Sequence, residues 1–142
     1  MSMALNATSK SKLWKVHPDL VRVVQRCADD WSDPATGFIV TCGVRTLEEQ
    51  RILKAKGASR TLRSRHIPAS NGFSHAVDLA CTINGQVRWD WPLYDKLAKA
   101  MKMAAKKEKV PLEWGGDWVS FKDGPHFQLP WVQYPGTAKG KK

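Results

Sequence analysis

Histidine and aspartate side chains occur at spacings that could hold a metal ion. His66, His75 and Asp78 lie within one stretch made otherwise of turn-forming and small apolar residues, and His126 lies near the C-terminus. A catalytic zinc ion in a hydrolase takes three protein ligands from such side chains. It leaves its fourth position to water, whose pKa it lowers towards about 7. The residue types therefore suit a metal-dependent hydrolase.

The spacing of these residues limits which of them could share one ion. His75 and Asp78 are three positions apart, so on a regular strand their side chains would point to opposite faces of the sheet. His66 lies upstream, in a loop that can fold back over the strand. The spacing therefore favours His66, Asp78 and His126, with His75 as a less favoured substitute. His66 could still be a solvated loop residue, and His126 a hydrogen-bonded core residue.

A metal hydrolase also needs a carboxylate beside the bound water, to accept its proton and pass it to the leaving amine. Asp123 precedes His126 by three residues, with a Gly-Pro turn between them, so both side chains could converge on one spot. Glu113 and Asp117 are the alternatives. Asp117 could instead cap a turn or orient a ligand histidine through a hydrogen bond.

These residues must be positioned by helices and strands that the sequence pattern predicts. Apolar residues at helical spacing indicate an amphipathic helix over 17–31, and the apolar run FIVTCGV after it is typical of a buried strand. Thr46 and Glu49 form a capping box that begins a second helix, which ends at Gly57. Residues 58–74 show no periodicity, so we expect a long loop there, and such loops in small domains often carry function.

The second half of the chain predicts a hairpin, a helix and two short strands. Apolar residues flank Asn84-Gly85, a strong hairpin signal that places Asp78 on a strand. Residues 91–109 have one apolar face and a lysine-rich remainder, and residues 110–131 contain a glycine loop between two strands. The expected fold is α+β, a small antiparallel sheet flanked by about three helices, with the metal site at the sheet and the long loop.

The length and composition fit one soluble domain. For the 142 residues we expect a domain over 1–135 and a basic, disordered tail over 136–142. No run approaches the roughly 18 apolar residues of a membrane span, and the start lacks an apolar signal segment. We therefore expect the protein to be made and kept in the cytoplasm. The three cysteines, Cys27, Cys42 and Cys81, have no C-x-x-C spacing, which predicts reduced core residues rather than a metal or redox role.

The formal net charge of +10 indicates an anionic partner or a charge that serves solubility. Nucleic acid, a membrane surface and anionic cell-wall polymers all qualify. The lysines of the helix over 91–109 could bind such a partner or form an ordinary solvated face.

Two motifs resemble those of a known enzyme family. Ser64-Arg65-His66 followed by Ala76-Val77-Asp78 is similar to the Ser-x-His and Gly-x-Ala-x-Asp pattern of the zinc-dependent peptidoglycan peptidases. These include D-alanyl-D-alanine carboxypeptidases and the L-alanyl-D-glutamate endopeptidases used as phage endolysins. Asp123-Gly124-Pro125-His126 is similar to their second motif, with EWGGDW just upstream as in phage members.

The chain departs from the family pattern within the first motif. His66 and Asp78 are twelve residues apart, farther than is usual, and Ser74 stands where the family has glycine. An inserted surface loop costs little chain entropy, so the ligand pair can survive it.

The resemblance implies a zinc site and a role for each residue near it. The implied zinc ligands are His66, Asp78 and His126, and the implied catalytic base is Asp123. Arg45 would grip a substrate carboxylate, assisted by Gln50, and Ser64 would support the loop and its ligand histidine. The alternative for Arg45 is a surface ion pair, and His75 remains a substitute ligand.

The function that follows is that of a zinc-dependent endolysin, which hydrolyses an amide bond of the peptidoglycan stem peptide, expected to be the L-alanyl-D-glutamate bond. It would accumulate in the host cytoplasm before release to the wall. We expect it to bind anionic envelope polymers through its basic surface, to act as a monomer and to need no nucleic acid. The alternatives are a D-Ala-D-Ala carboxypeptidase, a basic nucleic-acid-binding module, and a zinc-stabilised structural domain, which would need a closed site of four ligands.

Overall fold

The computed structural model describes residues 3–57, 64–119 and 122–135, and these form an α+β fold, as predicted. The helices are α1 (Ala7–Lys12), α2 (Pro18–Asp29), α3 (Leu47–Ala55) and α4 (Trp91–Glu108), with a short 3-10 helix η1 (Gly115–Asp117). The strands are β1 (Thr36–Cys42), β2 (Ala76–Ile83), β3 (Gln86–Arg88), β4 (Glu113–Trp114) and β5 (His126–Gln128).

The strands form one antiparallel sheet in the order β1-β2-β5-β4, with β3 also paired to β2. The long strand β2 pairs with β1 on one side. On its other side, its first residues pair with β5 and its last residues with β3. The predicted hairpin between β2 and β3 is present, and Asn84 and Gly85 both adopt positive φ angles, of 51° and 81°. These angles are those of the tight turn that Asn-Gly favours.

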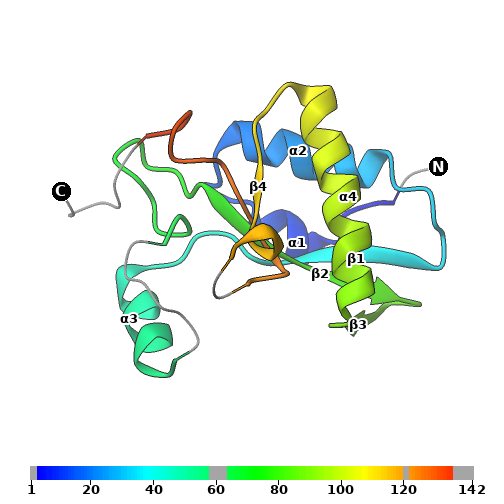
Figure 1. Cartoon of the computed structure of the whole chain (residues 1–142), viewed down its shortest axis with the longest axis horizontal. Helices are drawn as coiled ribbons and strands as arrows, with labels where there is room; N and C mark the ends of the chain where they lie inside the picture. The colour runs from blue at the N-terminus through cyan, green and yellow to red at the C-terminus, as the bar shows by residue number, and fades with distance from the viewer. Residues whose placement is uncertain (1–2, 58–63, 120–121, 136–142) are drawn as a thin grey trace.

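Helices α2 and α4 pack against each other and close the core beside the sheet (Figure 1). The amphipathic pattern of α2 is confirmed, because the apolar residues of one of its faces are buried with those of α4 and the central strands. This core includes Leu20, Val23, Val24, Phe38, Leu79, Leu97, Met101 and Phe127.

Helix α3 begins with the predicted capping box between Thr46 and Glu49. In Figure 1 it stands apart from the other helices, at the end of the molecule away from β3. Only its Gln50 is buried. Helix α3 therefore contributes little to the hydrophobic core, and most of its side chains are accessible to solvent.

One helix and one cysteine differ from expectation. Helix α1 was not predicted: it spans only six residues, and its N-cap Asn6 accepts a hydrogen bond from the Ser9 amide at 2.7 Å. Cys27 and Cys81 are buried, whereas Cys42 is only half-buried. The first part of the long loop, 58–63, and the predicted tail, 136–142, lie outside the described residues. None of the helices among the described residues combines the length and the apolar composition that a membrane span requires.

Candidate active site

His66 is brought to the sheet by the loop that precedes β2. The ring is 1% exposed, and its Nδ1 donates a hydrogen bond to the Gly43 carbonyl oxygen at 2.7 Å. With Nδ1 held in this way, Nε2 faces the carboxylate of Asp78, 3.1 Å from its Oδ1. The loop residue is therefore a buried, oriented imidazole rather than a solvated side chain.

Asp78 and His126 are brought together by strand pairing. They are direct partners in the register of β2 and β5, and Nδ1 of His126 lies 3.3 Å from Oδ1 of Asp78. The His66 and His126 rings meet edge to face, with centroids 5.0 Å apart. One carboxylate oxygen thus lies between two imidazole nitrogens from different parts of the chain.

This donor set fits a divalent metal ion. Two imidazoles and one carboxylate are ligands that zinc accepts, and three protein ligands leave a position open for water. Two further candidate ligands lie beside this set. Cys42 groups with His66 and Asp78, and Asp123 groups with Asp78 and His126, with the ligand atoms of each group within 4.8 Å of one another.

The charges of the site are strongly coupled. Burial on its own would lower the pKa of His66, but the nearby Asp78 carboxylate and Cys42 outweigh it and raise the pKa of this imidazole. Burial would raise the pKa of Asp78, but His66 and His126 lower it well below its ordinary range. Asp78 is therefore a carboxylate at neutral pH and provides the negative charge that a cation needs.

Asp123 lies beside this set, on the turn that leads into β5. Its carboxylate groups with Asp78 and His126, with ligand atoms all within 4.8 Å. Its backbone amide donates to the Gly115 carbonyl at 3.0 Å, which ties the turn to η1. Burial and the neighbouring Asp78 charge raise the pKa of Asp123. A carboxylate of raised pKa is a better proton acceptor than an ordinary aspartate.

The two alternative carboxylates are bound by other side chains. Asp117 is exposed and forms an ion pair with Lys102 at 2.7 Å. Glu113, on β4, accepts hydrogen bonds from Gln128 at 2.9 Å and from the indole of Trp118 at 3.2 Å. The structure gives Asp117 no hydrogen bond to a histidine of the described chain. Glu113 is linked to His126 instead, through hydrogen bonds that both residues make with Gln128.

Arg45 reaches the site from the loop before α3. Its guanidinium donates to Oε1 of Gln50 at 2.8 Å and to Oδ2 of Asp78 at 3.5 Å. Gln50, buried at the start of α3, thus fixes the direction of Arg45. The long Arg45–Asp78 contact leaves donor capacity for a second carboxylate, so the ion pair does not exclude the substrate role that the resemblance implies.

The Ser64-Arg65-His66 segment is held at each of its residues. Ser64 Oγ accepts the His66 amide at 3.1 Å. The buried Arg65 guanidinium donates to the carbonyls of Leu129 at 3.1 Å and Tyr134 at 2.6 Å. The loop that carries one histidine is thus attached to the chain that follows β5.

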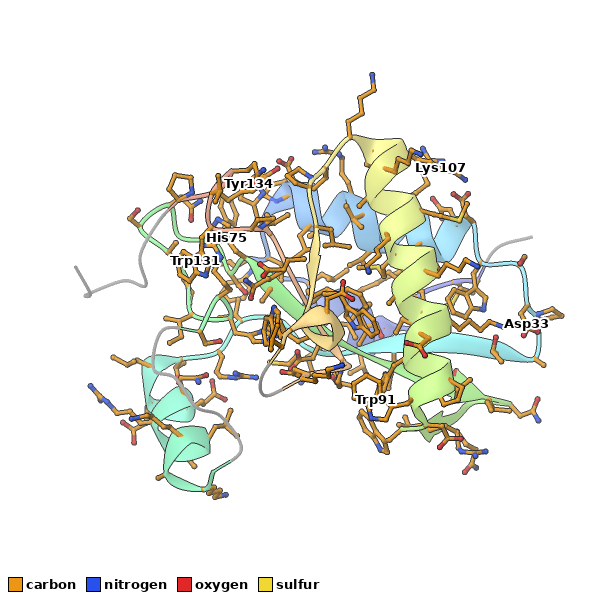
Figure 2. All side chains as sticks on the ribbon, viewed as in Figure 1. Asp33, His75, Trp91, Lys107, Trp131 and Tyr134 are labelled. Atoms are coloured by element: carbon orange, nitrogen blue, oxygen red, sulfur yellow. The ribbon has the colours of Figure 1, made fainter. Side chains whose placement is uncertain are left out.

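His75 is directed away from this centre. Its ring lies near those of His17 and Tyr134, with centroid distances of 5.2 and 6.3 Å, and Figure 2 shows it beside Tyr134. Burial, followed by the charges of Arg65 and His17, lowers its pKa to about 4. The expected opposite facing of His75 and Asp78 thus agrees with the structure.

Two residues at the site were not predicted from the sequence. Cys42, expected in the core, has its Sγ 3.8 Å from Nδ1 of His66, because a register shift between Val40 and Cys42 sets it opposite Asp78. Gln128 accepts a hydrogen bond from Nε2 of His126 at 2.7 Å. The signal for Gln128 was present, since residues two apart on a strand share a face.

Comparison with known proteins gives consistent matches. The chain is 32% identical over 124 residues to the L-alanyl-D-glutamate peptidase of Listeria phage A118, covering 87% of this chain and 41% of that protein. It therefore spans about two fifths of the length of that relative. It is 28% identical over 129 residues to the peptidoglycan L-alanyl-D-glutamate endopeptidase CwlK of Bacillus subtilis, covering 80% of this chain and 75% of CwlK.

A solved structure and a family match agree with these relatives. The crystal structure of the Serratia marcescens L-Ala D-Glu endopeptidase ChiX is similar with a TM-score of 0.80 and 42% identity, covering 91% of each chain. Residues 1–129 match the family of phage L-alanyl-D-glutamate peptidases. With a match over most of its length, and with the family's two motifs converging at one buried centre, this chain belongs to the phage L-alanyl-D-glutamate peptidase family.

Proposed function

We propose that this protein is a zinc-dependent endolysin that hydrolyses the L-alanyl-D-glutamate bond of the peptidoglycan stem peptide. The observation that carries the proposal is the convergence of Nε2 of His66, Nδ1 of His126 and the Asp78 carboxylate, with Asp123 beside them. Two relatives and a structural neighbour are named for this activity, which supports the choice of bond.

In this proposal His66, Asp78 and His126 hold the zinc ion. Zinc, when bound, supplies a Lewis acid that polarises the scissile carbonyl and lowers the pKa of a water molecule. Asp123 accepts the proton of that water on a carboxylate oxygen and delivers it to the nitrogen of the departing amine. Its raised pKa suits both halves of this transfer, because the group must first accept and then release the proton.

Arg45 has the position and chemistry to anchor the substrate. A guanidinium binds a carboxylate with two parallel hydrogen bonds, and Gln50 holds Arg45 in one orientation. We infer that it receives a free carboxylate of the stem peptide. Ser64 acts only through the loop, by accepting the His66 amide.

The basic surface supports binding to the anionic envelope. Three lysines of α4 are in exposed ion pairs: Lys96 with Asp33, Lys102 with Asp117 and Lys107 with Asp30. With a net charge of +10, the chain retains a large cationic excess outside such pairs. We infer that this excess concentrates a monomeric enzyme at the wall after its release from the host cytoplasm, and that nucleic acid has no part in its function.

Digestion of purified peptidoglycan by the purified full chain tests the proposed reaction. Fragment mass spectrometry should show stem peptides that begin with D-glutamate, and glycan strands that retain only L-alanine. Chelation should abolish the digestion and added zinc should restore it. Release of free D-alanine with an intact L-Ala-D-Glu bond would instead identify a carboxypeptidase.

Two variants separate the metal ligands from the base. Asp78→Ala should lose bound zinc and activity together, whereas Asp123→Asn should keep zinc and lose about 10²- to 10⁴-fold in rate. Asp117→Asn, at an exposed residue that pairs with Lys102, is the matched control and should retain both. If Asp123→Asn digests peptidoglycan at the wild-type rate, Asp123 is not the base.

A further inference from the structure

His126 is held by different partners at its two ring nitrogens. Nδ1 faces the Asp78 carboxylate at 3.3 Å, and Nε2 lies 2.7 Å from Oε1 of Gln128. Both side chains belong to β5 and lie on one face of it, and both are 6% exposed. Gln128 is therefore a buried neighbour of a candidate metal ligand on the side away from the metal position.

The orientation of the Gln128 amide follows from its second neighbour. Glu113 accepts a hydrogen bond from Nε2 of Gln128 at 2.9 Å. A carboxylate is only an acceptor, so the Gln128 amide nitrogen must face Glu113 and its oxygen must face His126. The alternative amide orientation would set two acceptors against each other.

Glu113 is itself fixed by a third residue. Its other oxygen, Oε2, accepts a hydrogen bond from the indole nitrogen of Trp118 at 3.2 Å, and the Trp118 ring lies against His126 with centroids 5.2 Å apart. An indole is only a donor. Trp118 and Gln128 therefore both donate to the Glu113 carboxylate. The Gln128 amide has only its oxygen left to face His126, so His126 must be the donor in that bond.

We propose that Gln128, oriented by Glu113, is a positioning residue that keeps the proton of neutral His126 on Nε2 and so presents the lone pair of Nδ1 to the metal. The inference rests on the proposed function only for the identity of the metal. Without the hydrogen bonds from His126 to Gln128 and from Gln128 to Glu113, the Asp78 carboxylate would draw the His126 proton onto Nδ1. An Nδ1 that carries hydrogen cannot bind a cation. Partners of this kind typically change metal affinity by about 10- to 100-fold.

The first test is Gln128→Leu, which removes the acceptor and keeps the approximate size of the side chain. Zinc affinity, measured by competition with a chromogenic chelator, should fall about 10- to 100-fold. In the metal-free protein, two-bond ¹H–¹⁵N correlation spectra should show the proton of neutral His126 moving from Nε2 to Nδ1. Gln25→Leu, which removes an exposed glutamine bonded to Asp29 on α2, is the control and should change neither measurement.

A reciprocal exchange separates positioning from a general loss of structure. Glu113→Gln should weaken zinc binding, because an amide at 113 can offer either its oxygen or its nitrogen to Gln128. The double variant Glu113→Gln with Gln128→Glu should recover a zinc affinity within about threefold of the wild-type value. In it, the carboxylate at position 128 accepts hydrogen bonds from His126 and from the amide nitrogen at position 113. The amide oxygen at position 113 still accepts from Trp118. A residue that merely fills space would show no such recovery.

The outcomes distinguish this inference from the proposed function. If the wild-type protein binds no zinc, the proposed function is wrong, and the tautomer of His126 in the metal-free protein still decides the role of Gln128. If zinc binds but Gln128→Leu leaves both its affinity and the His126 tautomer unchanged, the positioning role is overturned. Failure of the double variant to exceed Glu113→Gln in affinity would also overturn it.

Discussion

Asp78 and His126 face each other as register partners on adjacent antiparallel strands, with Oδ1 of Asp78 3.3 Å from Nδ1 of His126. Two of the three candidate ligands are thus fixed by the hydrogen-bond ladder of the sheet. The third, His66, comes from a loop, but its Nδ1 bond to Gly43 and its buried neighbour Arg65 fix it as well. A site held in this way exists before metal binds, so metal removal should leave the fold intact.

Gly115 should be required for the position of the catalytic base. A Cβ at this residue would overlap the carbonyl oxygen of Asp123, whose amide bonds to Gly115. Gly115→Ala must therefore shift the turn that carries Asp123, and we expect at least about a tenfold loss of hydrolysis with zinc content unchanged. Gly37→Ala is the control, because its nearest contact would be Thr82 Oγ1 at 3.3 Å, and it should keep its activity. Wild-type rates for Gly115→Ala would contradict this account of the turn.

Arg45→Met should reduce kcat/KM on stem peptides about 10- to 100-fold, because it removes a charge-assisted hydrogen bond to the substrate carboxylate. The effect should nearly vanish on a stem peptide whose free carboxylates are amidated, since that substrate has no charge for the guanidinium to bind. Arg51→Met on α3, the helix that follows Arg45, with a 58% exposed side chain, is the matched control. An equal loss on both substrates would instead indicate that Arg45 acts through Asp78.

His75 should make the protein less stable in mild acid. Its pKa is about 4 in the folded state, because of burial and the charges of Arg65 and His17, against 6.5 for an ordinary histidine. The unfolded chain therefore binds more protons between these values, and the free energy of unfolding falls as pH drops from 6.5 towards 4. The contribution is at most about 3 kcal/mol.

The measurement is denaturant unfolding of the metal-free protein at pH 7 and pH 4.5. His75→Leu should lose less stability between these pH values than the wild type. Within the described chain, Nδ1 of His75 is a buried atom without a hydrogen-bond partner, so the variant should also fold well at pH 7. His17 faces the same cluster and its pKa is also lowered, so some pH dependence should persist. Equal pH dependence in both proteins would refute the role of His75.

Salt should weaken digestion of whole walls more than hydrolysis of a small soluble stem peptide, because screening acts on the attraction between a cationic protein and an anionic polymer. Lys99 and Lys106 are exposed residues of α4, the helix whose paired Lys107 is labelled in Figure 2. Reversing both to glutamate should reduce wall digestion at low salt and leave peptide hydrolysis unchanged. If wall digestion is independent of salt and of these charges, the lysine face is only solvated.

Much of the fold could be predicted from local sequence alone. The helical pattern of α2, the Thr46–Glu49 capping box and the Asn84-Gly85 turn each depend on residues close together in the chain, and all three are present. Helix α1 escaped prediction because six residues show too little periodicity, and its stability depends on the Asn6 cap and on Ser9, which bonds to Val40 of β1.

The sequence by itself indicated the candidate ligands, because it has only four histidines, the spacing disfavours His75, and the motifs around His66, Asp78 and His126 resemble those of a zinc peptidase family. Only the tertiary structure decided how they meet. It set Cys42 opposite Asp78 through a register shift, turned His75 towards His17, and joined Gln128 to Glu113. The physical reason is that local spacing sets which face of an element a side chain occupies, whereas strand register and loop closure join residues far apart in the chain and depend on the packing of the whole fold.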